Sequence, residues 1–105
     1  MLGHVSRVNV KLGSMPVVKI TDPQQVSQIV AFVDSHRTGW TKPWQGIPVP
    51  AVTAECFDGT MFKGSFGAGN GFFETQREGG FFSQNASPSE LHRFLDLTGV
   101  AHVLE

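Results

Sequence analysis

The chain has 105 residues with 8 Lys or Arg and 9 Asp or Glu, which gives a formal charge of −1 at pH 7. This length fits one compact domain with its own core, and we expect residues 1–105 to form it, with 1–4 and 104–105 as ends that are disordered or left by cloning. Because the few basic residues are scattered, the sequence argues against a nucleic-acid partner. It contains no apolar run near the roughly 20 residues that span a bilayer.

The sequence bounds the cellular compartment only loosely. A single cysteine excludes an internal disulfide, and the first residues lack the cationic and apolar segments of a signal peptide. We therefore expect a cytoplasmic protein, or a mature fragment of an exported bacterial protein whose leader was removed. The sequence leaves these two open.

The first part of the chain predicts strands followed by a helix. Residues 5–12 alternate apolar and polar side chains, as a half-buried strand does, and 17–20 indicate a second short strand. A helix is predicted over 23–36, because Asp22 can cap it, a proline follows, and apolar residues recur at helical spacing. Gln25 stands where a capping box places Glu or Gln.

The second part predicts antiparallel strands and a closing helix. A loop rich in proline and glycine precedes four segments that indicate strands, namely 51–57, 60–66, 72–76 and 81–84. Asp58-Gly59 favours a type I′ hairpin turn that would pair Cys56 with Met61 and Glu55 with Phe62. The last helix begins at Pro88 after a Ser87 and Glu90 capping box and ends at Gly99.

This order of elements predicts an α+β fold, in which two helices pack on one face of an antiparallel, mostly meander sheet of about five strands. Neighbouring residues on a strand point to opposite faces, so Phe72-Phe73 and Phe81-Phe82 each send one ring to either side. Either both faces are covered, or one exposes phenylalanine as an interaction surface. We take Phe73 and Phe82 as candidates for binding a partner.

A loop with two tryptophans is the other candidate for binding. Trp40 and Trp44 stand on either side of Lys42, and tryptophan is enriched among the residues that dominate binding energy at interfaces. The alternative is that both indoles fold back over one end of the sheet and anchor the loop. The sequence leaves both interpretations open.

Signals for catalysis are weaker. The glycine-rich run 64–71 leads into an aromatic strand and lacks the helix that a phosphate-binding loop needs. We interpret Cys56 as a small buried thiol. The sequence does not determine the distances between the carboxylates of Glu55, Asp58 and Glu74, so it does not indicate a catalytic pair. None of the four histidines stands at a metal-ligand spacing, and His36 is expected at the solvated end of the first helix. We predict no catalytic residue, no metal and no cofactor.

The order of elements resembles cystatin-like and β-lactamase-inhibitor-like domains, small α+β folds that often act as inhibitors or binding modules. The cystatin motif QxVxG is not met, since Gln24-Gln25-Val26-Ser27-Gln28 ends in glutamine, so no functional residue carries over. We predict a non-enzymatic protein-binding or inhibitor-like module. One alternative is a pocket between helix and sheet that binds or converts a small ligand through Glu55, Glu74, His92 or Cys56. Another is a structural domain that self-associates through its phenylalanine-bearing face.

Overall fold

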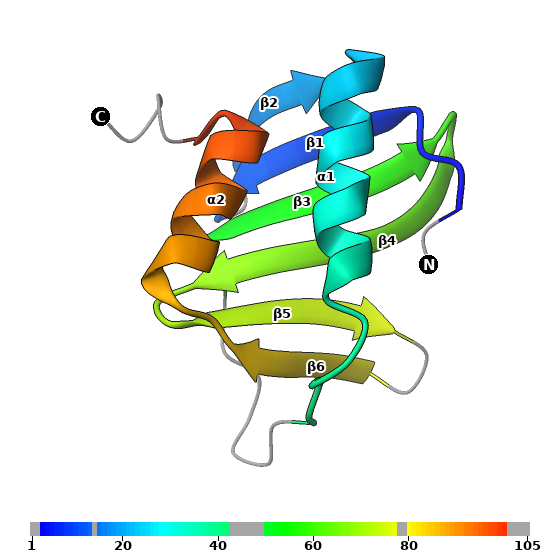
Figure 1. Cartoon of the computed structure of the whole chain (residues 1–105). Helices are drawn as coiled ribbons and strands as arrows, with labels where there is room; N and C mark the ends of the chain where they lie inside the picture. The colour runs from blue at the N-terminus through cyan, green and yellow to red at the C-terminus, as the bar shows by residue number, and fades with distance from the viewer. Residues whose placement is uncertain (1–2, 14, 43–49, 78–79, 101–105) are drawn as a thin grey trace.

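The computed structural model describes residues 3–13, 15–42, 50–77 and 80–100. They form an antiparallel six-stranded sheet with the order β2-β1-β3-β4-β5-β6, and both helices lie in front of it in Figure 1. The elements are β1 (Arg7–Leu12), β2 (Met15–Ile20), α1 (Pro23–Ser35), β3 (Val52–Asp58), β4 (Met61–Gly69), β5 (Phe72–Arg77), β6 (Gly80–Asn85) and α2 (Pro88–Thr98).

The predicted α+β class and the meander-like sheet are confirmed, with six strands instead of about five. The additional strand is β2, which pairs with β1 at the edge of the sheet. The sequence indicated a short strand there, but alternation alone does not show whether so short a segment joins the sheet. Pairing with β1 supplies the hydrogen bonds that decide it.

Local capping chemistry begins both helices, as predicted. The Asp22 carboxylate accepts a hydrogen bond from the backbone N–H of Gln25 at 3.1 Å. Ser87 and Glu90 form the complete capping box of α2, which Gly99 ends in the left-handed conformation with a φ of 75°. The prediction that Gln25 completes a capping box is wrong. The side-chain amide of Gln25 instead donates to the Leu97 carbonyl at 3.1 Å and thereby links α1 to α2.

The β3-β4 hairpin exists, but its predicted register is wrong. Asp58 pairs with Met61, so the two-residue loop is Gly59-Thr60 and not Asp58-Gly59. A type I′ turn needs positive φ at both loop positions, whereas here Gly59 has a φ of 61° and no described non-glycine residue has a positive φ. Glycine at the first loop position is typical of a type II′ turn.

Replacing Gly59 by valine should therefore destabilise the hairpin, because an L side chain at this φ costs about 1–2 kcal/mol. The measurement is the free energy of unfolding from urea denaturation. Thr60→Val, at the neighbouring loop position without positive φ, is the matched control and should change stability much less. Equal stability of the two variants would show that the loop does not depend on glycine.

The core lies between the sheet and the two helices. Its centre is an aromatic cluster formed by Phe32, Phe66, Phe73 and Phe94, whose ring centroids lie between 4.9 and 6.1 Å apart. Three of these rings are at most 1% exposed. The remaining buried apolar residues come from both helices, from strands β1 to β4 and from the chain after α2, and include Val8, Val10, Ile29, Ala54 and Val100.

Candidate binding site on the uncovered face of the sheet

The strand register defines a face of the sheet that neither of the two described helices covers. Consecutive cross-strand pairs join five residues into one row across the sheet, namely Lys11, Thr53, Gly67, Glu74 and Ser83. Residues next to them along the strands, such as Val10, Ala54 and Phe66, are buried under the helices. The row therefore lies on the opposite side, which we call the uncovered face.

Glu74 is a buried carboxyl group on the uncovered face. Only 6% of the residue is exposed, and its Oε2 is buried without a hydrogen-bond partner among the described residues. Burial raises the pKa of Glu74, because a carboxylate removed from water loses its hydration. An unpaired acid in this position is unusual, since buried polar groups are normally hydrogen-bonded.

A glycine lies opposite Glu74 on the neighbouring strand. Directly across the sheet stands Gly67, which has no side chain. A Cβ at Gly67 would lie 2.8 Å from Cβ of Pro50, closer than such atoms can approach. Pro50 thus packs onto the backbone of Gly67, and glycine is required there to leave room for the proline ring.

A cavity of about 240 Å³ opens beside Glu74. Its polar lining comes from Thr53, Glu55, Ser65, Gln76 and Glu74, and the rings of Phe62 and Phe81 also contact it. Glu55 is held by Lys11, with Nζ and Oε1 3.1 Å apart. The cavity therefore joins two acidic groups, of which one has a basic partner and the other has an unsatisfied oxygen.

Two further buried polar atoms lie on the same face. Among the described residues, Arg7 Nε and Asn9 Oδ1 are also buried without a hydrogen-bond partner. Arg7 pairs with Phe57 and Asn9 with Glu55 across the sheet, which places both on the uncovered face. The Arg7 guanidinium lies 4.7 Å from the centre of the Phe57 ring. All three unsatisfied atoms thus belong to one surface.

The predicted phenylalanine pairs point to opposite faces, but the choice of Phe73 as a contact residue is wrong. Phe73 is fully buried in the aromatic cluster, and the register places Phe82, opposite Thr75, on the same helix-covered side, where it is half-buried. Phe81 lines the cavity on the uncovered face. Alternation shows that the two rings of a pair separate, but only the position of the helices decides which one is buried.

Among the tryptophan-loop residues, Trp40 is half-buried and packs against the core. Its indole N–H donates to the His36 carbonyl, and its ring meets Phe66 edge-on with centroids 5.8 Å apart. These contacts favour the anchoring interpretation for Trp40. Lys42 is exposed. Trp44 lies outside the described residues, so its role stays a prediction.

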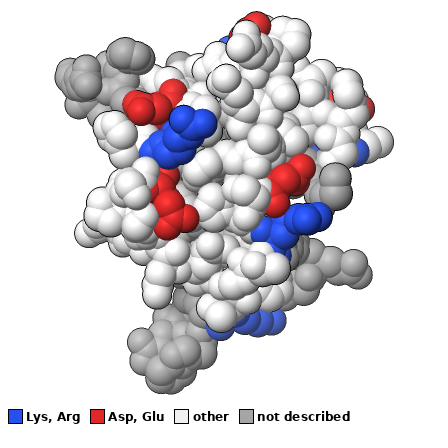
Figure 2. Space-filling model, in the orientation of Figure 1, with Lys and Arg blue, Asp and Glu red and all other residues white. Residues whose placement is uncertain are grey.

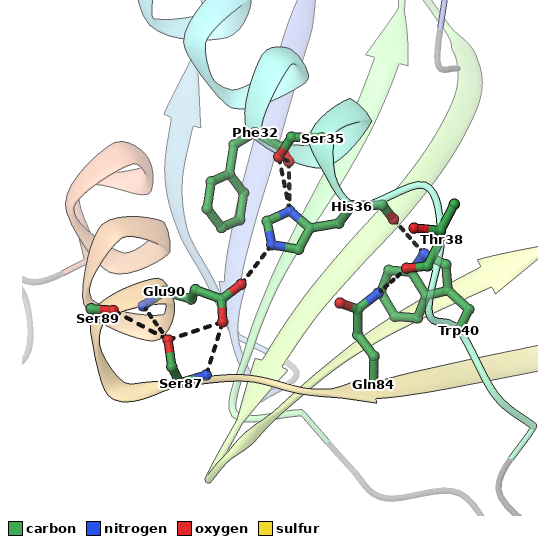
Figure 3. Close-up of polar contacts among 9 residues, drawn as sticks. All are labelled: Phe32, Ser35, His36, Thr38, Trp40, Gln84, Ser87, Ser89 and Glu90. Carbon is green, nitrogen blue, oxygen red and sulfur yellow. Dashed lines mark hydrogen bonds and ion pairs between the residues drawn. The ribbon is translucent and has the colours of Figure 1, made fainter.

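A polar network around His36 is the second cluster of titratable groups (Figure 3). The side chain is 12% exposed, and its ring lies among Phe32, Phe66 and Phe73. The expectation of a solvated helix-end histidine is therefore wrong. The ring Nδ1 lies 2.8 Å from the Phe32 carbonyl oxygen, and Nε2 lies 3.1 Å from Oε2 of Glu90.

The hydrogen bonds of this pair link the two helix ends. The two ring nitrogens of His36 face two different oxygen atoms, that of the Phe32 carbonyl and that of the Glu90 carboxylate. Glu90 accepts from the backbone N–H of Ser87 at 3.1 Å, and this bond, followed by the one from His36, lowers the pKa of Glu90. The pair joins the negative end of α1 to the positive end of α2, where each charge is favoured.

The same residues do not form a hydrolytic triad. Ser35 Oγ lies 3.1 Å from Nδ1 of His36, which resembles the order serine, histidine, acid. However, the Ser35 hydroxyl donates to the Phe32 carbonyl at 2.6 Å, and Nδ1 of His36 faces that same carbonyl. Neither ring nitrogen can then accept a serine proton. The network connects helices and does not activate a nucleophile.

Cys56 lies in the core with 1% exposure. Burial, and secondarily the charge of Asp34, raise the pKa of its thiol to about 11. A nucleophilic cysteine needs the thiolate form near neutral pH. This environment favours the interpretation of Cys56 as a packing residue.

Other surfaces of the described residues show fewer features of a binding site. A larger cavity, of about 450 Å³, lies between residues 3–6 and the start of α1, but none of the unsatisfied polar atoms lines it. No group of three or more His, Cys, Asp or Glu side chains in the described ranges could hold a metal ion. Neither described helix is long and apolar enough to cross a membrane. Figure 2 shows that acidic and basic side chains are few and scattered on the helix-bearing side, and no continuous basic stripe is visible in this view.

Comparison of the chain with protein families, with curated proteins and with solved structures found no significant match. The resemblance to inhibitor-like domains therefore stays a prediction, and function has to be inferred from the site itself.

Proposed function

We propose that the protein is a non-enzymatic binding module that engages a protein partner through the uncovered face of its sheet. The observation that carries this proposal is the gathering of Arg7 Nε, Asn9 Oδ1 and Glu74 Oε2 on that face. A buried polar atom without a partner costs about 1–3 kcal/mol. A partner that supplies the missing hydrogen bonds recovers this energy on binding, whereas in the free protein the cost remains.

Aromatic surface beside these atoms supports the proposal. Phe62 is 47% exposed and lines the cavity, and its ring centre lies 5.6 Å from that of Phe57. Met61, at the tip of the same hairpin, is 63% exposed. Aromatic and methionine side chains are enriched in protein interfaces, where they bury large areas of apolar surface. Polar groups with missing partners and accessible aromatic rings thus occur together.

One observation favours the small-ligand alternative, because Glu55 and Glu74 line the same cavity. That cavity lies on the uncovered face and not between helix and sheet. Its volume of about 240 Å³ is below the roughly 300–1,000 Å³ of most small-molecule sites. It is better matched to a single side chain of a larger partner, so we favour the protein-binding function.

Selection from a displayed library of random peptides, followed by affinity measurements on the selected peptides, tests the proposed function. We expect the double variant Phe62→Ser, Phe81→Ser to bind them at least about ten-fold more weakly, as loss of aromatic contacts at an interface does. Met15→Ser is the matched control, since Met15 is 68% exposed on the edge strand β2, and should bind as the natural chain does.

Two results would contradict the proposal. Equal affinity of the selected peptides for the double variant and for the natural chain would place binding elsewhere on the molecule. A mass that rises with concentration in light scattering, and that the double variant abolishes, would instead support self-association through the uncovered face.

A further inference from the structure

We propose that the cavity beside Glu74 receives the primary ammonium group of a lysine side chain that the protein partner contributes. This inference rests on the proposed function and names the chemistry of its central contact. It starts from Glu74, which lines the cavity and whose Oε2 is buried without a hydrogen-bond partner in the described part of the chain.

The chemistry of the lining selects a cation. An ionised carboxylate buried without a partner is costly, and a positively charged donor removes that cost most effectively. Glu55 adds a second carboxyl group to the same cavity. The rings of Phe62 and Phe81 are suitable neighbours for the aliphatic stem and the charged end of a basic side chain.

The described part of the chain does not supply this cation. Lys11, the basic residue in the same cross-strand row, is bound to Glu55 at 3.1 Å. Arg7 lies over the Phe57 ring, beyond the next row on this face, which holds Asn9 and Glu55. Residues 43–49, which precede Pro50 in the sequence, contain no Lys, Arg or His. No described residue pairs with Oε2 of Glu74, and we infer that another molecule supplies the positive charge.

The arrangement of acceptors favours lysine over arginine. An ammonium group is compact and donates three hydrogen bonds, whereas a guanidinium is a flat fork that pairs best with both oxygens of one carboxylate. Here the lining offers separate acceptors, the two carboxyl groups and the side-chain oxygens of Thr53, Ser65 and Gln76, in a cavity of about 240 Å³. Several acceptors from different strands match the ammonium group better.

Nuclear magnetic resonance titration of the full chain tests the inference, with N-acetyl-lysine-N-methylamide as the probe and the norleucine analogue, which lacks the charge, as its control. We expect the lysine probe to shift the amide signals of Gly67, Glu74 and Ser83 saturably, with a dissociation constant on the order of 1–10 mM, as a single weak contact gives. The norleucine analogue should leave these signals unchanged.

Two variants make the test specific. Glu74→Gln keeps the shape and removes the charge, and it should weaken binding of the lysine probe at least about ten-fold, as truncation of a buried charge pair does. Its melting temperature should equal or exceed that of the natural chain, which shows that it is folded. Asp96→Asn removes an exposed charge on α2, where Asp96 faces His92 at 3.4 Å, and should bind the probe unchanged.

The inference is overturned if the lysine probe causes no shift at these amides, if the norleucine analogue causes equal shifts, or if N-acetyl-arginine-N-methylamide binds more tightly than the lysine probe. Butylammonium serves as a probe for free amines. If it binds more tightly than every selected peptide, the site is assigned to a free amine and the inference is also overturned. The proposed function and the lysine contact can fail independently. If the selected peptides contain no lysine but still need Phe62 and Phe81 for binding, the protein-binding function stands and the lysine contact is wrong.

Discussion

Replacement of Phe66 by alanine is expected to destabilise the protein by about 3–5 kcal/mol, as loss of a fully buried aromatic ring does. Phe66 is 1% exposed and is in ring contact with Phe73 at 4.9 Å and Phe94 at 5.3 Å. It also meets His36 and Trp40, so both helices and the loop after α1 depend on it. Domains of this size are stable by only about 5–15 kcal/mol in total, so the variant should be close to unfolding.

The measurement for Phe66 is the melting temperature together with the free energy of unfolding from urea denaturation. A loss of about 3 kcal/mol lowers the melting temperature by more than roughly 10 °C in a domain of this length. Met61→Ala on the same strand is the control, because Met61 is 63% exposed and its loss should change stability by less than about 1 kcal/mol. Similar losses in both variants would mean that the aromatic cluster is not the centre of the core.

Replacement of His36 by alanine is expected to have the second largest effect, a loss of about 2–4 kcal/mol. The ring makes two hydrogen bonds, to the Phe32 carbonyl and to Glu90, and packs against three phenylalanines. Removing it opens space in the core and separates the two helix ends. His92→Ala is the control, since the His92 side chain is 74% exposed and its ion pair with Asp96 contributes little.

The dependence of stability on pH tests the charge of this pair. Hydrogen bonds from Ser87 and His36 lower the pKa of Glu90 in the folded protein, so its contribution is present above the ordinary value of 4.5 and is lost as the pH falls through the folded value. Glu90→Gln keeps a residue that the capping box accepts but removes the charge. Its stability deficit should therefore shrink in acid, and a deficit independent of pH would contradict the ion pair.

Glu74 affects the pH dependence of stability in the opposite direction to Glu90. Its folded pKa is raised, so the ionised form lowers stability once the pH rises through that value, whereas below 4.5 the cost disappears. A protein selected only for stability would not keep a buried acid of this kind. The expected stability of Glu74→Gln and its expected loss of the cation contact together separate a binding role from a structural one.

The features that the sequence alone determined are local. Asp22, Ser87 and Glu90 cap helices through backbone groups within three residues, so their chemistry is readable without tertiary information. The hairpin was recognisable for the same reason, although its register depended on which loop residue takes a positive φ. Alternation along the strands likewise showed that neighbouring phenylalanines separate to opposite faces.

The tertiary structure decided what depends on distant residues. His36 meets Glu90 across 54 positions of sequence, and no local pattern predicts that a helix-end histidine becomes buried among aromatic rings. Glu55 and Glu74 share a cavity because β3, β4 and β5 are adjacent in the sheet. Alternation assigns residues to two faces but does not show which face the helices cover. That choice is made by helix packing, and it buried Phe73 and left Glu74 on the face that we propose binds a partner.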